Sequence, residues 1–541
     1  MTTARFALLS FAEVRARLLA REETALLDVR EEDPFAQAHP LWAANLPLSR
    51  IEIEAWRRIP RRDTLIVLYG EHDGTDLAPR AAATLAALGY TNLHLLEGGL
   101  EGWRRAGGEL FRDVNVPSKS LGELVEHERH TPSLSASEVK ALVDARADVV
   151  VLDARRFDEY QTMSIPSATS VPGAELVLRV RELAPDPATQ VIVNCAGRTR
   201  SIIGTQSLVN AGIPNPVAAL RNGTIGWKLA GQVLDHGAAR QAPAAVSGAH
   251  RAQAQADARR VADRAGVRRI ALDALHTLEA PGRTLYRFDV RTPEDYAAGH
   301  LPGFASAPGG QLVQETDHQV PVRGARIVLA DDDGVRAAMS ASWLAQMGWE
   351  VYVLDTVPSA SAFSEKAAPA AAHPPPAFTA GEIAPKALAA LLAQPGTALI
   401  DVTTSANYVK RHIPGAWYAI RAQLAQALDG GGIAPSRRYV LTCGSSLLAR
   451  YAAADLRALL DARGQADAEV LVLAGGNAAW FAEGLGEETG ETRLATPRTD
   501  RYRRPYEGTD APAEAMQAYL DWEFGLVAQL ARDGTHHFTV I

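Results

Sequence analysis

Cysteine is scarce in this chain. Only two cysteines, Cys195 and Cys443, occur among its 541 residues. Two cysteines are too few for a disulfide framework, and neither belongs to a CxxC or Cys/His spacing typical of a metal site. We therefore expect no disulfide network, no metal and no cofactor. The setting of each cysteine becomes informative instead.

Long blocks of one charge and long apolar runs are also absent. The chain has 63 acidic and 55 basic residues, with a formal net charge of −8. This balance argues against nucleic acid or an anionic membrane as a partner. No apolar run reaches the ~18 to 20 residues that span a bilayer. The N-terminal apolar stretch is interrupted by Glu13 and by arginines, unlike a signal peptide. We expect a soluble, cytoplasmic protein.

The chain repeats itself. Its hydrophobic content of 47% is typical of globular protein, and its length exceeds what one core supports. A short apolar strand ending in aspartate occurs four times, at Asp28, Asp153, Asp289 and Asp401. Three of the repeats then carry a related phrase, SIPSATSVPG, GHLPGFASAPG or RHIPGAWYAI. A period of 112 to 136 residues fits one small domain.

Each repeat alternates apolar strands with amphipathic helical patterns. This alternation predicts an α/β domain, with a small parallel sheet covered by helices on both faces. We place the repeats at residues 5–115, 133–236, 267–357 and 378–486. Residues 237–266 form a linker with helical character, and the Pro/Ala-rich residues 356–377 are predicted to be an extended spacer. The tail, residues 487–541, contains a predicted helix that should pack against a repeat.

The second repeat contains the most informative segment, QVIVNCAGRTRS. Cys195 directly follows an apolar strand and precedes a predicted helix. The amides and the helix dipole at such a turn suit an anion and should lower the pKa of the thiol. Arg198 and Arg200 add two positive charges within five residues. The loop is therefore predicted to activate a sulfur nucleophile and to bind a sulfur oxyanion.

CAGRTRS resembles the active-site loop of the rhodanese family, and the repeated phrases resemble the fold signatures of that family. The resemblance implies four tandem rhodanese-like domains and a sulfurtransferase of the thiosulfate type. Cys195 would take the outer sulfur of a donor such as thiosulfate, become a persulfide and pass the sulfur to cyanide or a thiol. The loop residues implied to bind substrate are Ala196, Gly197, Arg198, Thr199, Arg200 and Ser201.

Two other interpretations of the loop stay open. Cys195 could be a small buried hydrophobe at a strand end, although packing alone would not require the neighbouring arginines. A Cys-based phosphatase places arginine six residues after its cysteine, whereas Arg200 is five residues after Cys195 and Ser201 is the sixth. A tighter loop should fit a persulfide better than a phosphoryl group, so phosphatase activity ranks lower.

The other repeats look degenerate. At the matching position the first has YGEHDGTD and the third has ADDDGVR, so neither offers a thiol, and both are predicted to be inactive. Cys443, in the fourth repeat, is a weak candidate for a second reactive thiol because its loop, TCGSS, lacks early arginines. Arg155 and Arg156 follow the strand that ends at Asp153 and are weak candidates for substrate contact. The strand-end aspartates, which recur without cysteine, should be structural.

Two functional hypotheses of different kinds follow. The first is an enzyme that transfers sulfane sulfur from a small sulfur anion to a thiol or cyanide. The second is a sulfur carrier or interaction scaffold, in which the inert repeats dock a protein and the Cys195 repeat accepts sulfur. The presence of three further repeats motivates the second hypothesis, because one repeat would suffice for the chemistry.

Overall fold

The computed structural model describes residues 6–72, 77–279, 281–366, 374–508 and 510–541. Residues 73–76 of the first repeat's predicted loop and residues 367–373 of the predicted spacer lie outside these ranges. Four separate sheets, each flanked by helices, follow one another along the chain. The α/β prediction with four repeats is confirmed.

Unit 1 has the strand order β1-β5-β4-β2-β14, with β3 beside β2. Strand β14 belongs to unit 3 in sequence and pairs antiparallel with β2, so one sheet joins the two units. The strands are β1 (Ala7–Leu9), β2 (Thr24–Asp28), β3 (Ala44–Asn45), β4 (Ile66–Tyr69), β5 (Leu93–Leu96) and β14 (Val322–Arg323). The helices are α1 (Phe11–Ala20), α2 (Glu32–Gln37), the 3-10 helix η1 (Leu48–Arg50), α3 (Ile51–Arg58), α4 (Leu77–Ala87) and α5 (Gly99–Arg105).

Unit 2 has a five-stranded parallel sheet in the order β6-β10-β9-β7-β8. Its strands are β6 (Ser133–Leu134), β7 (Val149–Asp153), β8 (Thr169–Ser170), β9 (Gln190–Asn194) and β10 (Val217–Leu220). Its helices are α7 (Ala136–Asp144), α8 (Phe157–Thr162), η2 (Gly173–Glu175), α9 (Leu176–Leu183), α10 (Thr199–Ala211) and α11 (Gly223–Leu229).

Units 3 and 4 repeat this parallel order. The strands of unit 3 are β11 (Arg268–Ile270), β12 (Leu285–Asp289), β13 (Ala305–Ser306), β15 (Arg326–Ala330) and β16 (Glu350–Leu354), and those of unit 4 are β17 (Gly381–Ile383), β18 (Thr397–Asp401), β19 (Trp417–Tyr418), β20 (Arg438–Thr442) and β21 (Glu469–Leu473). The helices of unit 3 are η3 (Leu272–Leu278), α13 (Pro293–Ala298), α14 (Gly309–Gln314), α15 (Thr316–Gln319), α16 (Arg336–Gln346) and η4 (Ala360–Ala362). Those of unit 4 are α17 (Pro385–Leu392), α18 (Ser405–Lys410), η5 (Arg421–Gln423), α19 (Leu424–Gly430), α20 (Leu447–Ala462) and α21 (Gly476–Ala482).

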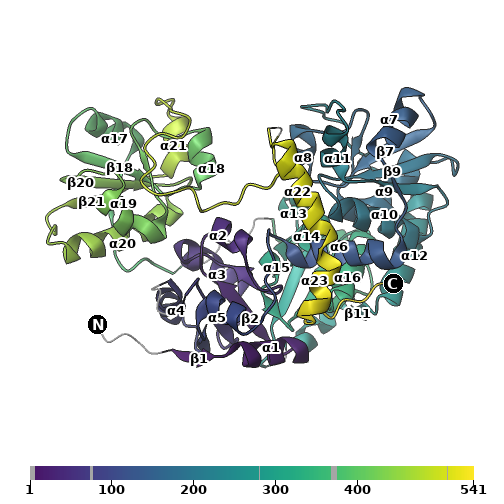
Figure 1. Cartoon of the computed structure of the whole chain (residues 1–541), viewed down its shortest axis with the longest axis horizontal. Coiled ribbons are helices and arrows are strands. Elements are labelled where there is room, and N and C mark those ends of the chain that lie inside the picture. Colours follow the sequence, from purple (N-terminus) through teal and green to yellow (C-terminus); the bar gives the residue numbers. More distant parts are fainter. Residues whose placement is uncertain (1–5, 73–76, 280, 367–373, 509) are drawn as a thin grey trace.

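Four further helices connect the units or follow them. They are α6 (Val116–Arg129), α12 (Gly248–Arg264), α22 (Ala513–Phe524) and α23 (Leu526–Asp533). The linker 237–266 is thus partly helical, as predicted. The tail helices α22 and α23, yellow in Figure 1, cross the linker helix α6 and lie far from unit 4, which precedes them in sequence.

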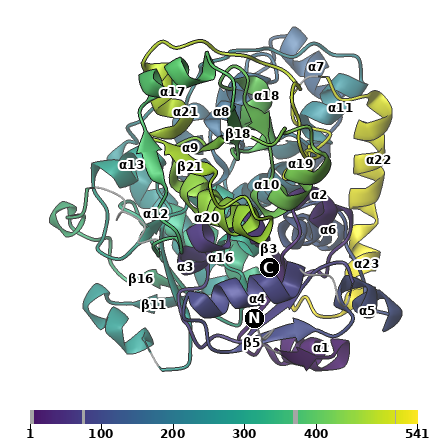
Figure 2. The ribbon, with the colours of Figure 1, turned by 90° about the vertical axis from the view of Figure 1, so that its left-hand side faces the viewer.

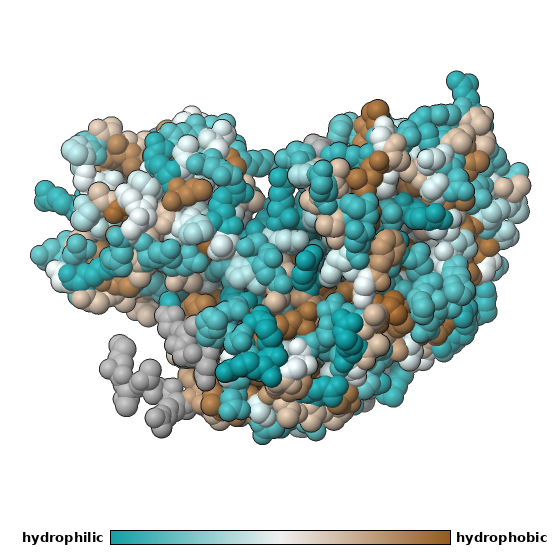
Figure 3. Space-filling model, viewed as in Figure 1, coloured by the Kyte–Doolittle hydropathy of each residue, from teal (hydrophilic) through white to brown (hydrophobic). Residues whose placement is uncertain are grey.

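Buried ion pairs join unit 4 to unit 1 and unit 3 to unit 2. Arg421 of unit 4 bonds Glu52 of unit 1 at 2.7 Å, and Arg336 of unit 3 bonds Glu175 of unit 2 at 2.9 Å. Figure 2, in which the molecule is turned by 90° about the vertical axis, shows unit 4 (green) in front of units 2 and 3. The space-filling view shows an indentation between the lobe of unit 4 and that of unit 2 (Figure 3).

The strand-end aspartates stabilise the turn that follows each central strand. Asp153 is fully buried and accepts hydrogen bonds from the Arg155 side chain at 2.7 and 2.8 Å and from Asn194 at 2.8 Å. Asp28 with Arg30 and Asp289 with Arg291 repeat the pair. The structural role predicted for these aspartates is confirmed by their contacts.

We predict that Asp153→Asn destabilises the protein by about 3 to 5 kcal/mol, because it leaves the buried Arg155 cation without its partner. Urea unfolding followed by the tryptophan fluorescence of the whole chain, to which the buried Trp227 of unit 2 contributes, would measure the change. Asp158→Asn, at a side chain that is 68% exposed, is the control and should cost less than about 0.5 kcal/mol. Equal stability of the two variants would contradict the structural role.

Candidate active site

Cys195 lies in the loop between β9 and α10, at the carboxyl edge of the unit 2 sheet. Residues 191–194 of β9 are buried, and the helix begins at Thr199, so the loop is short and its ends are fixed. Helix α10 directs its amino-terminal amides and its positive dipole toward the loop. The predicted strand–cysteine–helix geometry is therefore present.

Helix α11 supports the loop through backbone hydrogen bonds. The amides of Thr224 and Ile225 donate to the carbonyl oxygens of Cys195 (2.9 Å) and Ala196 (3.0 Å). Gly223 has φ +53°, and a Cβ there would lie 2.3 Å from the Cys195 carbonyl oxygen. Any larger residue at position 223 would clash with the loop, so the glycine permits this close approach.

The Cys195 thiol is enclosed. The residue is 2% exposed, and Sγ donates a hydrogen bond to Ser201 Oγ at 3.5 Å. Burial raises the pKa of the thiol; the positive charge of Arg200 and the contacts with Ser201 act in the opposite direction but do not outweigh it. The sequence-based prediction of a lowered pKa is therefore wrong for this closed arrangement, because loop chemistry alone carries no information about burial.

Arg198 is occupied by side chains from outside unit 2. Its guanidinium donates to Glu123 of α6 at 2.7 and 2.9 Å and pairs also with Glu126. The Phe524 ring of α22 lies 4.2 Å from the guanidinium carbon. Only 3% of the side chain is exposed. The structure thus places Arg198 as the link between the cysteine loop and two helices that no loop motif predicts.

Arg200 is the loop arginine whose charge acts on the thiol. It forms a bidentate pair with Glu159 of α8, at 2.7 and 2.8 Å. The charge of the same guanidinium lowers the pKa of the Cys195 thiol, in the direction opposite to burial, and so favours a negative charge on the sulfur. Of the two predicted anion-binding arginines, Arg200 is the better placed.

The tail forms a roof over the loop. Met516, Tyr519 and Leu520 of α22, with Tyr506 before it, pack against Ala196 and Ile225 in one buried cluster. A Cβ added to Gly197 would lie 3.2 Å from the Tyr519 ring. Gly197 thus allows the roof to close directly over the residues that follow Cys195. The prediction that the tail packs against a repeat is confirmed by these contacts.

A buried charged group lies within this roof. Glu523 of α22 is 0% exposed, and its Oε1 accepts from Tyr519 Oη at 2.8 Å and from Thr199 Oγ1 at 3.4 Å. Burial and the nearby Glu123 raise the pKa of Glu523, whereas Lys119 and Arg198 act in the opposite direction. Lys119 of α6 bonds Asp113 at 2.7 Å and lies over the Tyr519 ring.

Arg155 and Arg156 differ in their surroundings. Arg155 is committed to Asp153 and to the Met163 carbonyl oxygen, whereas the Arg156 side chain is 54% exposed and pairs with Asp158. Both line a hollow of about 370 Å³, which Glu159 and Tyr506 also border. The hollow therefore reaches Glu159, which pairs with Arg200, and Tyr506, at the edge of the roof. It lies beside the candidate site without containing Cys195 in its lining.

The sequence analysis missed the residues from α6 and the tail, namely Lys119, Glu123, Glu126, Tyr506, Tyr519 and Glu523. The charged and aromatic pattern of these segments gave no sign of their partner. One available signal was Gly122 of α6: a Cβ there would lie 3.2 Å from Thr199 Cγ2, so the glycine eases the close approach of α6 to the loop.

Comparison with known proteins decides the family. A model described as "Rhodanese-like domain" matches residues 10–106, 135–230, 273–356 and 384–483. The chain belongs to the rhodanese family. A crystal structure of thiosulfate sulfurtransferase from Pseudomonas aeruginosa is 65% identical, covers 99% of this chain and 100% of its own, and has a TM-score of 0.95.

Other matches are partial. An HTH-type transcriptional regulator from Mycobacterium tuberculosis is 32% identical over 91 residues, which is 17% of this chain and 39% of the regulator. This chain therefore matches well under half the length of that curated relative. The Alr3790 protein from Anabaena sp. is 24% identical over 20% of this chain and 85% of its own, with a TM-score of 0.19.

Units 2 and 4 share a loop support but not the loop chemistry. In unit 4, Asn477 N donates to the Cys443 carbonyl oxygen at 2.8 Å, as Thr224 does in unit 2. Cys443 is 5% exposed. Arg450, the next arginine along the chain, pairs with Glu382 on the surface. Among the described residues of units 1 and 3, no thiol occupies the corresponding loop, in line with the sequence.

We predict that Tyr519→Ala/Leu520→Ala makes Cys195 react with iodoacetamide at least about tenfold faster at pH 7.5, because each lost buried side chain costs the closed roof about 2 kcal/mol or more. The apparent pKa of the thiol should also fall as water enters, since burial is what raises it. Peptide mass spectrometry would follow the two cysteines separately.

Gln517→Ala, on the exposed side of α22, is the matched control. Cys443, which lies outside the roof cluster, is an internal reference for unfolding. An unchanged Cys195 rate, or equal acceleration at Cys443, would contradict the roof.

Proposed function

We propose that this protein is a sulfurtransferase that moves sulfane sulfur from thiosulfate or a similar donor to a thiol or cyanide through a persulfide on Cys195. The observation that carries the proposal is the juxtaposition at one loop of a thiol, the α10 amino terminus and Arg200. The full-length similarity to a thiosulfate sulfurtransferase supports it. The proposed partners of the enzyme are small sulfur-containing anions and a thiol or cyanide acceptor. A protein sulfur acceptor is a further candidate.

In the first half-reaction the Cys195 thiolate attacks the outer sulfur of thiosulfate. The new bond joins Cys195 Sγ to that sulfur, the sulfur–sulfur bond of the donor breaks, and its electron pair leaves with sulfite. In this proposal Arg200 and the α10 amides stabilise the negative charge on the persulfide and on the leaving group. In the second half-reaction cyanide or a thiolate attacks the outer sulfur, and the Cys195 thiolate leaves. This order is ping-pong.

The closed roof imposes an opening step in this proposal. A thiol that is 2% exposed cannot meet thiosulfate, so Tyr519 and its neighbours on α22 have to move or rotate before the donor enters. The hollow lined by Arg156, Glu159 and Tyr506 is the proposed approach. Hydration on opening would lower the thiol pKa and so couple entry of the donor to formation of the nucleophile.

The carrier or scaffold hypothesis remains the alternative, and a Cys-based phosphatase ranks below it. Units 1, 3 and 4 support a scaffold because unit 1 contacts unit 3 through β14 and unit 4 through Arg421, and none of the three has a cysteine loop with an early arginine. Robust steady-state turnover with thiosulfate and cyanide favours the enzyme, whereas persulfidation without turnover favours the carrier. Cytoplasmic location stays a prediction; among the described residues no helix is long and apolar enough to cross a bilayer.

We predict that Cys195→Ser abolishes sulfur transfer and that Cys443→Ser retains most of it. With thiosulfate alone, the unaltered protein should gain about 32 Da on the peptide that contains Cys195, the mass of one sulfur held by a nucleophilic thiol. Cyanide should remove the added mass. Activity in Cys195→Ser, or release of phosphate from an aryl phosphate without any sulfur adduct, would overturn the assignment.

We predict that Arg200→Ala lowers kcat/KM for thiosulfate by about 10- to 100-fold, since a charge-assisted contact to the reacting sulfur is lost. Arg200→Lys should recover part of the activity, and the pKa of Cys195 should rise further in Arg200→Ala. Arg221→Ala, at an exposed arginine of the same unit, is the control. Steady-state kinetics that do not distinguish Arg200→Ala from this control would contradict the role.

A further inference from the structure

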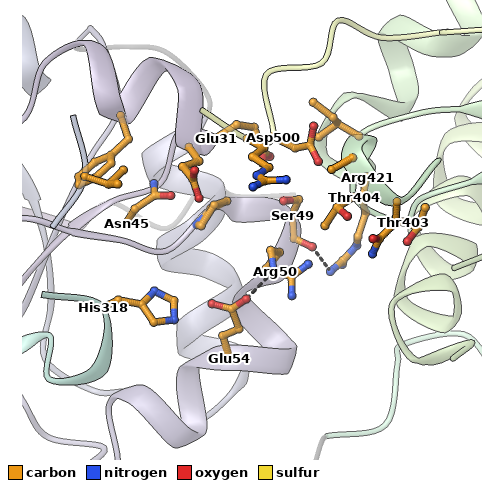
Figure 4. A pocket seen from close by; sticks show the side chains of 18 of the residues that line it. Glu31, Asn45, Ser49, Arg50, Glu54, His318, Thr403, Thr404, Arg421 and Asp500 are labelled. Carbon is orange, nitrogen blue, oxygen red and sulfur yellow. Dashed lines mark hydrogen bonds and ion pairs between the residues drawn. The ribbon is translucent and has the colours of Figure 1, made fainter. Parts of the chain in front are cut away.

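The tail is fixed on both sides of the helix that forms the roof. Upstream of α22, Asp500 Oδ2 accepts a hydrogen bond from the Ser405 amide of unit 4 at 2.7 Å. Figure 4 shows Asp500 at a second cavity, of about 440 Å³, where units 1, 3 and 4 meet the tail. Downstream, Gln529 of α23 donates to the Leu110 carbonyl oxygen at 2.8 Å. Helix α22 can therefore move away from the Cys195 loop while the tail stays attached at both ends.

Closure of the roof buries the carboxyl group of Glu523 incompletely satisfied. The side chain is 0% exposed. Its Oε1 accepts from Tyr519 Oη at 2.8 Å and from Thr199 Oγ1 at 3.4 Å, whereas Oε2 has no hydrogen-bond partner within the described part of the chain. Oε2 lies 3.5 Å from the Cβ position of Gly197, and so directly against the Cys195 loop. A charge on such an oxygen is costly in the interior, and a proton removes that cost.

The charged groups around Glu523 come from α6 and from the loop. Helix α6 contributes Lys119 and Glu123, and the loop contributes Arg198. Each of the two cations already has a carboxylate partner, because Lys119 bonds Asp113 and Arg198 bonds Glu123, both at 2.7 Å. Burial, followed by the charge of Glu123, raises the pKa of Glu523 to about 8, while the two cations act in the opposite direction. The surroundings therefore favour the neutral acid.

The other titratable side chains of the closed roof are neutral near pH 7. Burial raises the pKa of the Tyr506 phenol and raises that of Tyr519 well above its usual value. Burial, and to a smaller degree the charge of Glu523, raise the pKa of the Cys195 thiol. An ionised Glu523 and an ionised Cys195 thus disfavour each other. The closed form holds a protonated acid near a protonated thiol.

We propose that Glu523 is a pH-dependent switch of the active site: the roof closes with its carboxyl group protonated, and loss of that proton to solvent shifts α22 to the open form. The switch regulates the Cys195 site and rests on the proposed function for its role in sulfur transfer. In the open form water solvates both oxygens, and the pKa returns to about 4.3. Protonation therefore favours closure; this advantage is complete below about pH 4.3 and is lost as the pH rises to about 8. Glu123 stays paired with Arg198, which joins α6 to the loop and not to α22.

The pH dependence of Cys195 alkylation by iodoacetamide in the full chain tests the proposal. Two protons leave before the unaltered protein reacts, one from Glu523 on opening and one from the thiol. Between about pH 6 and 7.5 the rate should therefore rise about 100-fold per pH unit. In Glu523→Gln the amide stays neutral and only the thiol titrates, so the rise should be about tenfold per unit. Peptide mass spectrometry follows Cys195 and Cys443 separately.

Asp521→Asn makes the same change of carboxylate to amide on the exposed side of α22, and this matched control should keep the steep dependence of the unaltered protein.

Tyr519→Phe is a second variant, in case Glu523→Gln does not fold. It removes a hydrogen bond that favours the ionised form of Glu523, so the steep range should extend to higher pH. The proposal is overturned if the unaltered protein shows only a tenfold rise per unit, if Glu523→Gln is equally steep, or if the range does not change in Tyr519→Phe. An equally steep rise at Cys443 would show general unfolding and overturns it too. Alkylation uses no sulfur donor, so a failure of sulfur transfer would leave this test unaffected.

Discussion

The ion pair between Arg198 and Glu123 connects the cysteine loop of unit 2 to the rest of the molecule. Both side chains are almost fully buried, and Glu126 is a second carboxylate partner of Arg198. Loss of Arg198 would therefore leave Glu123 unpaired in a low-dielectric interior. Because Glu123 lies on α6, the pair fixes the helix that leads out of unit 1 against the loop of unit 2. The roof formed by α22 then packs on both, and Phe524 covers the Arg198 guanidinium. A single rhodanese unit could not build this site alone.

The same principle joins the units to one another. Arg421 with Glu52 and Arg336 with Glu175 each place one buried guanidinium on the carboxylate of a neighbouring unit. Strand β14 adds a backbone connection by extending the unit 1 sheet. In the proposed function, the other three repeats contribute through position. They hold α6 and the tail where the Cys195 loop needs them, and they enclose the second cavity between units 1, 3 and 4.

Local patterns in the sequence predicted much of the fold, because each repeat carries its strand, turn and helix signals within about a hundred residues. The position of Cys195 between β9 and α10 followed from the same patterns. The residues that contact the Cys195 loop from other parts of the chain did not follow from these patterns. Arg198 meets Glu123 across 75 residues of sequence, and Thr199 meets Glu523 across 324. Such contacts depend on how whole units pack, so the sequence predicted free arginines and an acidic thiol where the structure has paired arginines and a buried one.

The central claim is that one of four similar units carries the chemistry and that the others position it. Rapid mixing of the protein with excess thiosulfate, without an acceptor, measures this through the sulfite released in the initial burst. The account predicts one sulfite per chain, because both cysteines precede a helix but only Cys195 has a loop arginine whose charge favours the thiolate. A burst of two per chain would show that Cys443 also reacts, and no burst would show that Cys195 does not accept sulfur from thiosulfate.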